Sequence, residues 1–154
     1  MNHEDCMKRA IEYARAAALH GDVPVGAVIV HGGKIIAWGE NRREADRDSC
    51  AHAEILAIRM AAEVLGDWRL DGAALYVTLE PCPMCAGAIA MSRISEVYFG
   101  AYDGESGCCG SLYNLPADAR LGTDTRVFGG LMREECAALI TEFFESLRKK
   151  PSVY

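Results

Sequence analysis

The chain has 154 residues, of which 51% are hydrophobic and 25% are charged, and its formal net charge is -6. These values are typical of a soluble globular protein, so we expect residues 1–154 to form a single domain. No apolar run is long enough to cross a bilayer, and residues 1–5 are acidic and unlike a secretory signal. The seven cysteines lack the spacing of a disulfide scaffold, which favours a reduced, cytoplasmic setting.

The negative net charge argues against broad non-specific binding of nucleic acid, which depends on a basic surface. Two short basic runs remain as candidates for a local patch. One contains Arg42, Arg43 and Arg47, and the other is formed by residues 148–150. Taken alone, each run is more simply interpreted as solvated surface charge.

The first elements in chain order are a helix and a β-hairpin. Apolar residues recur at helical spacing over residues 7–18, which predicts an amphipathic helix that ends near residue 20. Two apolar runs, 25–30 and 34–39, are separated by a Gly-Gly pair and predict a hairpin. Because the first run is apolar at every position, we expect helices to cover both faces of the sheet.

A loop and a second helix follow the hairpin. Residues 41–48 are polar and show no periodicity, which predicts the loop. Asp48 or Ser49 is a candidate N-cap for the helix, which begins near His52 and runs to about Leu65. We expect this helix to bury its larger apolar side chains, namely Ile55, Leu56, Ile58 and Met60.

The second half of the chain alternates strands and helices. Residues 75–79 predict a strand, and Pro81 or Pro83 then begins a helix, because the first helical position needs no amide hydrogen. The remaining elements are a strand, an irregular Gly-rich loop of functional length, a short strand and a closing helix, at residues 97–101, 103–115, 126–128 and 133–149. The closing helix has an apolar stripe formed by Cys136, Leu139, Ile140, Phe143, Phe144 and Leu147.

The segments 51–54 and 81–85 contain candidate metal ligands. His52, Cys82 and Cys85 offer an imidazole and two thiolates, which are good ligands for zinc. A structural zinc site normally has four protein ligands, whereas a catalytic site keeps three and leaves the fourth position to water. Neither segment contains a fourth Cys or His, so we expect a catalytic site with one zinc per chain. Both segments fall at helix N-termini, where open α/β sheets build their sites.

Glu54 lies two residues beyond His52 and therefore points in a different direction from that ligand. We expect it to reach the zinc-bound water without binding the metal, and to act as a proton shuttle. The zinc-bound hydroxide would attack a carbon that bears an amino group, which then leaves as ammonia. Without the cysteine pair, Glu54 would simply be a first-turn carboxylate that stabilises the helix dipole.

The order His-x-Glu and then Pro-Cys-x-x-Cys is the signature of zinc-dependent nucleobase deaminases. Over nearly its whole length the chain resembles the bacterial tRNA-specific adenosine deaminases. The matching stretches are residues 23–28, 39–42, 51–55, 75–82, 84–89, 92–94, 99–101, 110–112, 135–139 and 143–144. The zinc motif is shared with cytosine, cytidine and guanine deaminases, whereas residues 78–87 and 109–112 are closer to the tRNA enzymes.

The resemblance implies a three-layer α/β/α, cytidine deaminase-like fold with a mixed five-stranded sheet. It implies a homodimeric, zinc-dependent hydrolase that converts the wobble adenosine of a tRNA anticodon stem-loop to inosine. The target base would be flipped out of a loop, where unstacking costs little.

By residue, the resemblance makes His52, Cys82 and Cys85 the zinc ligands and Glu54 the proton shuttle. It also implies five substrate-binding residues: Asn41 bonded to the target base, Val25 and Ala53 in its pocket, Asp103 beside the anticodon backbone, and Phe144 near the neighbouring nucleotides.

Two of these residues have simpler interpretations without the resemblance. Asn41 alone would be a turn residue. Phe143 and Phe144 would be core residues, although only one of two adjacent helical residues can fully face the core, which leaves the other as a stacking platform. The chain also departs from the family at Tyr102 and Glu105, where many members have Arg or Lys near Asp103. Its second departure is Arg43, where many members have Pro.

Three alternatives remain open at this point. The first is a deaminase of a free base or nucleoside, such as guanine, cytosine or cytidine, which would have a capped site in place of an open one. The second is a non-catalytic deaminase-fold partner that binds RNA, although such a partner would not need Glu54. The third is a zinc-free redox protein that uses the Cys-x-x-Cys pair.

Overall fold

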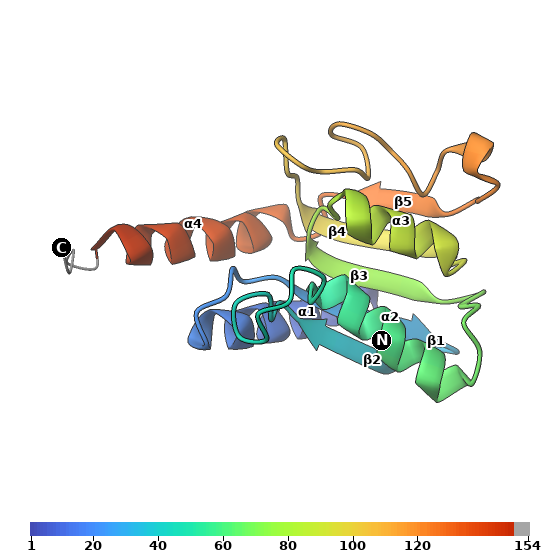
Figure 1. Cartoon of the computed structure of the whole chain (residues 1–154), viewed down its shortest axis with the longest axis horizontal. Coiled ribbons are helices and arrows are strands. Elements are labelled where there is room, and N and C mark those ends of the chain that lie inside the picture. The colour runs from blue at the N-terminus through green and yellow to red at the C-terminus, as the bar shows by residue number, and fades with distance from the viewer. Residues whose placement is uncertain (150–154) are drawn as a thin grey trace.

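The computed structural model describes residues 1–149 and contains one mixed sheet (Figure 1). The five strands lie in the order β2-β1-β3-β4-β5. β1 is antiparallel to β2 and β3, whereas β3, β4 and β5 are parallel to one another. The strands are β1 (Gly26–His31), β2 (Lys34–Glu40), β3 (Ala74–Leu79), β4 (Glu96–Ala101) and β5 (Arg126–Gly129). The mixed five-stranded sheet predicted from the sequence is confirmed.

Helices cover both faces of this sheet, as expected from the apolar first strand. The helices α1 (His3–Leu19) and α4 (Arg133–Lys149) share one buried cluster on one face. The helices α2 (Ala53–Leu65) and α3 (Pro83–Met91) pack on the opposite face, in front of the sheet in Figure 1. β1 alternates between the two layers, since Ile29 belongs to the cluster with α2 and Val28 to the cluster with α1. The fold therefore has the predicted three layers.

Two glycine positions explain how the hairpin and the second helix fit together. The predicted Gly-Gly turn, Gly32 and Gly33, has positive φ angles of 59° and 75°, which glycine adopts without strain. A Cβ atom added to Gly39 in β2 would clash with the carbonyl oxygen of Ala53. The start of α2 therefore lies directly against the sheet backbone.

The structure corrects two predictions about α2. Its N-cap is His52 and makes no side-chain capping bond, whereas Asp48 accepts a hydrogen bond from the amide of Cys50 at 2.9 Å within its own turn. Its buried residues are Ala53, Glu54, Ala57 and Ala61. The predicted core residues Ile55, Leu56, Ile58 and Met60 are only half-buried. Close packing on the sheet admits only small side chains in the middle of that helix face.

The closing helix follows its predicted range but not its predicted burial. Cys136 and Leu139 are buried against the sheet, whereas Phe144 and Leu147 are 42% and 44% exposed. The reason is that α4 projects beyond the ends of the strands (Figure 1), so its second half lies outside the sheet. Within residues 1–149, no helix combines the length and apolar character that a membrane span requires.

Candidate active site

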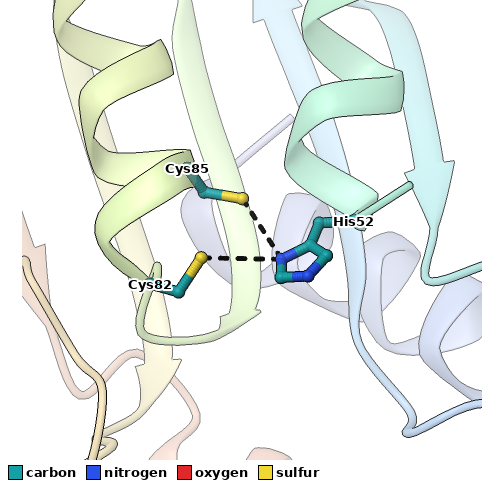
Figure 2. Close-up of side chains that lie close together, drawn as sticks. All are labelled: His52, Cys82 and Cys85. Carbon is teal, nitrogen blue, oxygen red and sulfur yellow. Dashed lines mark hydrogen bonds between the residues drawn. The ribbon is translucent and has the colours of Figure 1, made fainter. Parts of the chain in front are cut away.

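The three predicted metal ligands converge between the starts of two helices. His52 is the N-cap residue of α2, Cys82 is the N-cap residue of α3, and Cys85 lies in the first turn of α3. Figure 2 shows both thiols directed at the same imidazole nitrogen. The Nδ1 atom of His52 lies 3.6 Å from Sγ of Cys82 and 3.5 Å from Sγ of Cys85.

These separations fit a zinc ion. Bonds of about 2.3 Å to sulfur and about 2.0 Å to nitrogen in a tetrahedron place the nitrogen about 3.5 Å from each sulfur. The three donor atoms lie within 4.8 Å of one another, and no fourth His, Cys, Asp or Glu joins this group in residues 1–149. The arrangement is therefore that of a three-ligand site, and not of a closed structural one.

The local electrostatics favour a thiolate at Cys82, whereas the hydrogen bond to Cys82 and burial raise the pKa of Cys85. The hydrogen bond from the Cys85 thiol is the largest influence on Cys82 and lowers the pKa of that residue to about 4. This shift favours the thiolate form of Cys82, which is the form that binds zinc. Its position at a helix N-terminus adds to this stabilisation of negative charge.

Glu54 is only 4% exposed, although it lies in the first turn of a helix. Burial is the main cause that raises the pKa of its carboxyl group to about 7. A group whose pKa is near neutrality can both accept and donate a proton. This burial does not fit an exposed carboxylate that only stabilises the helix dipole.

A cavity of about 530 Å³ opens beside the ligands and brings the predicted residues together. It is lined by His52, Glu54 and Cys82, while Cys85 is fully buried behind them. All five residues predicted to bind substrate also line it, namely Val25, Asn41, Ala53, Asp103 and Phe144. Their placement agrees with the sequence prediction, and their roles stay predictions.

Asn41 is held by bonds to its own loop and to the segment before β1, whereas Asp103 is held by bonds within its own loop. The Nδ2 atom of Asn41 donates to the carbonyl of Val23 at 3.1 Å, and its Oδ1 atom accepts from the amide of Arg43 at 3.1 Å. One N–H and one lone pair of this amide remain for a ligand. The carboxylate of Asp103 accepts hydrogen bonds from the amides of Glu105 and Ser106 and from the Ser106 hydroxyl. Asp103 therefore shapes the loop that borders the cavity.

Residues 1–101 match the family described as the cytidine and deoxycytidylate deaminase zinc-binding region. The chain belongs to this family. The matched range includes all three members of the His-Cys-Cys cluster, which could hold the zinc that gives this family its description. Membership in a zinc-binding family removes the alternative of a zinc-free redox protein.

Two relatives in this family act on tRNA and one acts on a base. A tRNA-specific adenosine deaminase of Bacillus subtilis (strain 168) is 51% identical over 144 residues, which are 94% of this chain and 89% of that protein. A solved structure from work on A-to-I editing by tRNA:A34 deaminases has a TM-score of 0.84 and 44% identity, and covers 88% of this chain and 98% of that one. A guanine deaminase from Bacillus subtilis has a TM-score of 0.64 and 48% identity over 66% of each chain.

The structure adds a buried carboxylate, Glu80, which the sequence reasoning missed. Glu80 is 2% exposed, lines the cavity and directly precedes the segment that carries Cys82. It accepts hydrogen bonds from the amides of Asp103, Cys109 and Ser111 at 3.1, 3.1 and 2.9 Å, and from the Ser111 hydroxyl. One carboxylate thus joins both ends of the loop that borders the cavity.

A second missed carboxylate, Asp22, holds another loop that borders the cavity, the one that follows β2. Asp22 is fully buried and accepts hydrogen bonds from the amides of Glu44 and Ala45 at 2.6 and 3.1 Å. Its other contact is His20, whose Nδ1 atom lies at 2.8 Å. Glu80 and Asp22 escaped the sequence analysis because most of their partners are backbone amides, which have no signature in a sequence. The available signal was the position of each carboxylate next to a buried strand, Asp22 before β1 and Glu80 after β3, where an acidic side chain needs hydrogen-bond donors.

Replacing Glu80 with Gln is expected to lower the free energy of unfolding by about 2 kcal/mol, since an amide has one acceptor oxygen and leaves buried N–H groups without a partner. Hydrogen exchange is expected to quicken across residues 103–111. Denaturant titration and exchange mass spectrometry measure both effects. Glu96→Gln is the matched control, because Glu96 bonds Tyr98 and Arg126 away from the cavity. Equal exchange in that loop for both variants would contradict the assigned role.

Proposed function

We propose that this chain is a zinc-dependent hydrolase that deaminates the wobble adenosine of a tRNA anticodon to inosine. The observation that carries the proposal is the cavity itself. It brings together a three-ligand metal site, a buried carboxylate and the side-chain amide of Asn41, which has hydrogen-bonding groups left for a base. Glu54 and Asn41 both line it beside His52. The Bacillus subtilis relative named tRNA-specific adenosine deaminase matches over 94% of this chain, which supports the same substrate.

The rim of the cavity supports a substrate larger than a free base. Phe144 and Leu147 line the cavity on α4 and remain 42% and 44% exposed. Because α4 projects beyond the ends of the strands (Figure 1), it leaves the Phe144 side chain accessible for stacking with a nucleotide. A capped site for a free base would bury these side chains.

The residues of this chain divide the chemistry between them. Zinc, held by His52, Cys82 and Cys85, would act as a Lewis acid on water. Glu54 accepts a proton from the attacking water, delivers it to the ring nitrogen of the adenine, and then assists the departure of ammonia. Asn41 orients the base through its free N–H and lone pair, so that the overall change is adenosine plus water to inosine plus ammonia.

We further propose that the protein acts as a homodimer in the cytoplasm and that residues 1–154 form one domain. Apolar side chains near the ends of α2 and α3 support a partner surface, since Val64, Trp68 and Met91 are 57%, 58% and 70% exposed. None of the seven cysteines, all within residues 1–149, is part of a disulfide, which supports a reducing compartment.

The test is deamination of an anticodon stem-loop with adenosine at the wobble position by the zinc-loaded protein. Inosine in the digested RNA supports the proposal. Guanine, cytosine, cytidine and adenine are assayed in parallel, because the guanine deaminase that resembles two thirds of this chain makes free guanine the second candidate substrate. Ammonia release from guanine with an unchanged stem-loop would overturn the RNA substrate and keep the zinc chemistry. A protein inactive on every substrate would overturn the enzyme itself and favour an RNA-binding partner.

A further inference from the structure

The cavity is acidic, which is unfavourable for a polyanionic substrate. Its lining includes the carboxyl groups of Asp22, Glu44, Glu54, Glu80 and Asp103. The chain as a whole has a net charge of -6. If the proposed function holds, an RNA strand must bring its phosphates to this surface, and binding then requires a cation close to the entrance.

Within residues 1–149, Arg43 is the only Lys or Arg among the residues that line the cavity. Its side chain is exposed, and it forms no ion pair within residues 1–149. The adjacent Arg42 differs, because it pairs with Asp46 at 3.0 Å and with Glu40 at 3.9 Å. Of the three arginines in this basic run, Arg43 is therefore the one that is both free of an acidic partner and placed at the cavity.

The backbone of Arg43 is fixed from several sides. Its amide donates to Oδ1 of Asn41 at 3.1 Å, and its carbonyl accepts from the amide of Asp48 at 3.1 Å. The two residues that follow it are bonded to the buried carboxylate of Asp22. The guanidinium group thus extends from a rigid position next to Asn41, which we propose contacts the target base.

We infer that Arg43 binds a phosphate of the RNA strand next to the nucleotide whose base enters the cavity. A base held at Asn41 leaves its sugar and phosphates at the entrance, within reach of the neighbouring side chain. Guanidinium matches two phosphate oxygens with a pair of parallel N–H groups, which gives both charge and orientation.

Arg43→Ala, Arg43→Lys and Arg42→Ala are compared with the wild type in stem-loop deamination at several salt concentrations. Arg43→Ala is expected to raise KM about tenfold, because it removes a charged hydrogen bond, and to leave kcat within about twofold. For Arg43→Ala, the negative slope of log(kcat/KM) against log salt should become less steep by about 0.7, which is the contribution of one phosphate contact on a single strand. Arg43→Lys should keep the wild-type slope with a smaller increase in KM. Arg42→Ala should match the wild type in both quantities.

The outcomes separate this inference from the function on which it rests. A wild-type enzyme that leaves the stem-loop unchanged overturns the proposed function and this inference with it. A wild-type enzyme that forms inosine, together with an Arg43→Ala variant of unchanged KM and salt slope, overturns this inference alone. The same holds if Arg42→Ala loses as much as Arg43→Ala, since the effect would then come from general surface charge.

Discussion

Glu54→Gln is expected to lower kcat by about 10³-fold, since general acid–base catalysis by one positioned group contributes about 10²- to 10⁴-fold. Glutamine has nearly the same shape and keeps its contacts, but it cannot take a proton from water and return it to the substrate. The zinc ligands are untouched, so the zinc content should stay at the wild-type level. The free energy of unfolding should not fall, because a neutral amide is easier to bury than a carboxylate. Single-turnover inosine formation and zinc analysis measure the two effects.

Glu44→Gln is the matched control for this experiment. Glu44 also lines the cavity, but its side chain is exposed, and only its backbone amide bonds Asp22. Its variant should keep kcat within a few-fold of the wild type. A Glu54→Gln variant that retained more than about a tenth of the activity would contradict the role of Glu54 as the proton shuttle. The proton would then have to move through another group.

The His-Cys-Cys cluster could be predicted from the sequence because metal binding restricts the residue types. Only a few side chains bind zinc, so His52, Cys82 and Cys85 stand out by type and spacing. The helices and strands were predictable for a related reason, since residues buried on one face repeat at a regular interval. The ranges of α2 and α4 agree with these predictions at their C-terminal ends, at Leu65 and Lys149.

The sequence does not reveal hydrogen bonds from a side chain to main-chain amides, because every residue except proline has the same amide group. Asp22 and Glu80 hold the two loops beside the cavity through main-chain amides, and an amide looks the same at every position. The prediction of an Asp48 cap was wrong for a similar reason, since that carboxylate had a nearer amide to accept from within its own turn. The burial of α2 depended on how closely Gly39 allows the helix to approach, which is a tertiary property.

Cys85→Ala is expected to abolish zinc binding and to reduce deamination by more than about 10³-fold, because two ligands cannot hold the metal that activates water. Adding zinc should restore activity to the chelated wild type and not to this variant. Thermal unfolding should shift to lower temperature, since a metal that binds only the folded state stabilises it. Metal analysis, calorimetry and the stem-loop assay measure these three effects.

Cys136→Ala separates loss of zinc from loss of a buried thiol. Cys136 is 1% exposed and packs in α4 against the other face of the sheet, far from the ligands in sequence. Its truncation should cost about 1 kcal/mol of stability through a small cavity and should leave the zinc content unchanged. If Cys136→Ala lost zinc as Cys85→Ala does, the loss would follow from a loosened core. If Cys85→Ala kept a full equivalent of zinc, the assignment of this thiol as a ligand would be wrong, and the metal would have to sit elsewhere than between α2 and α3.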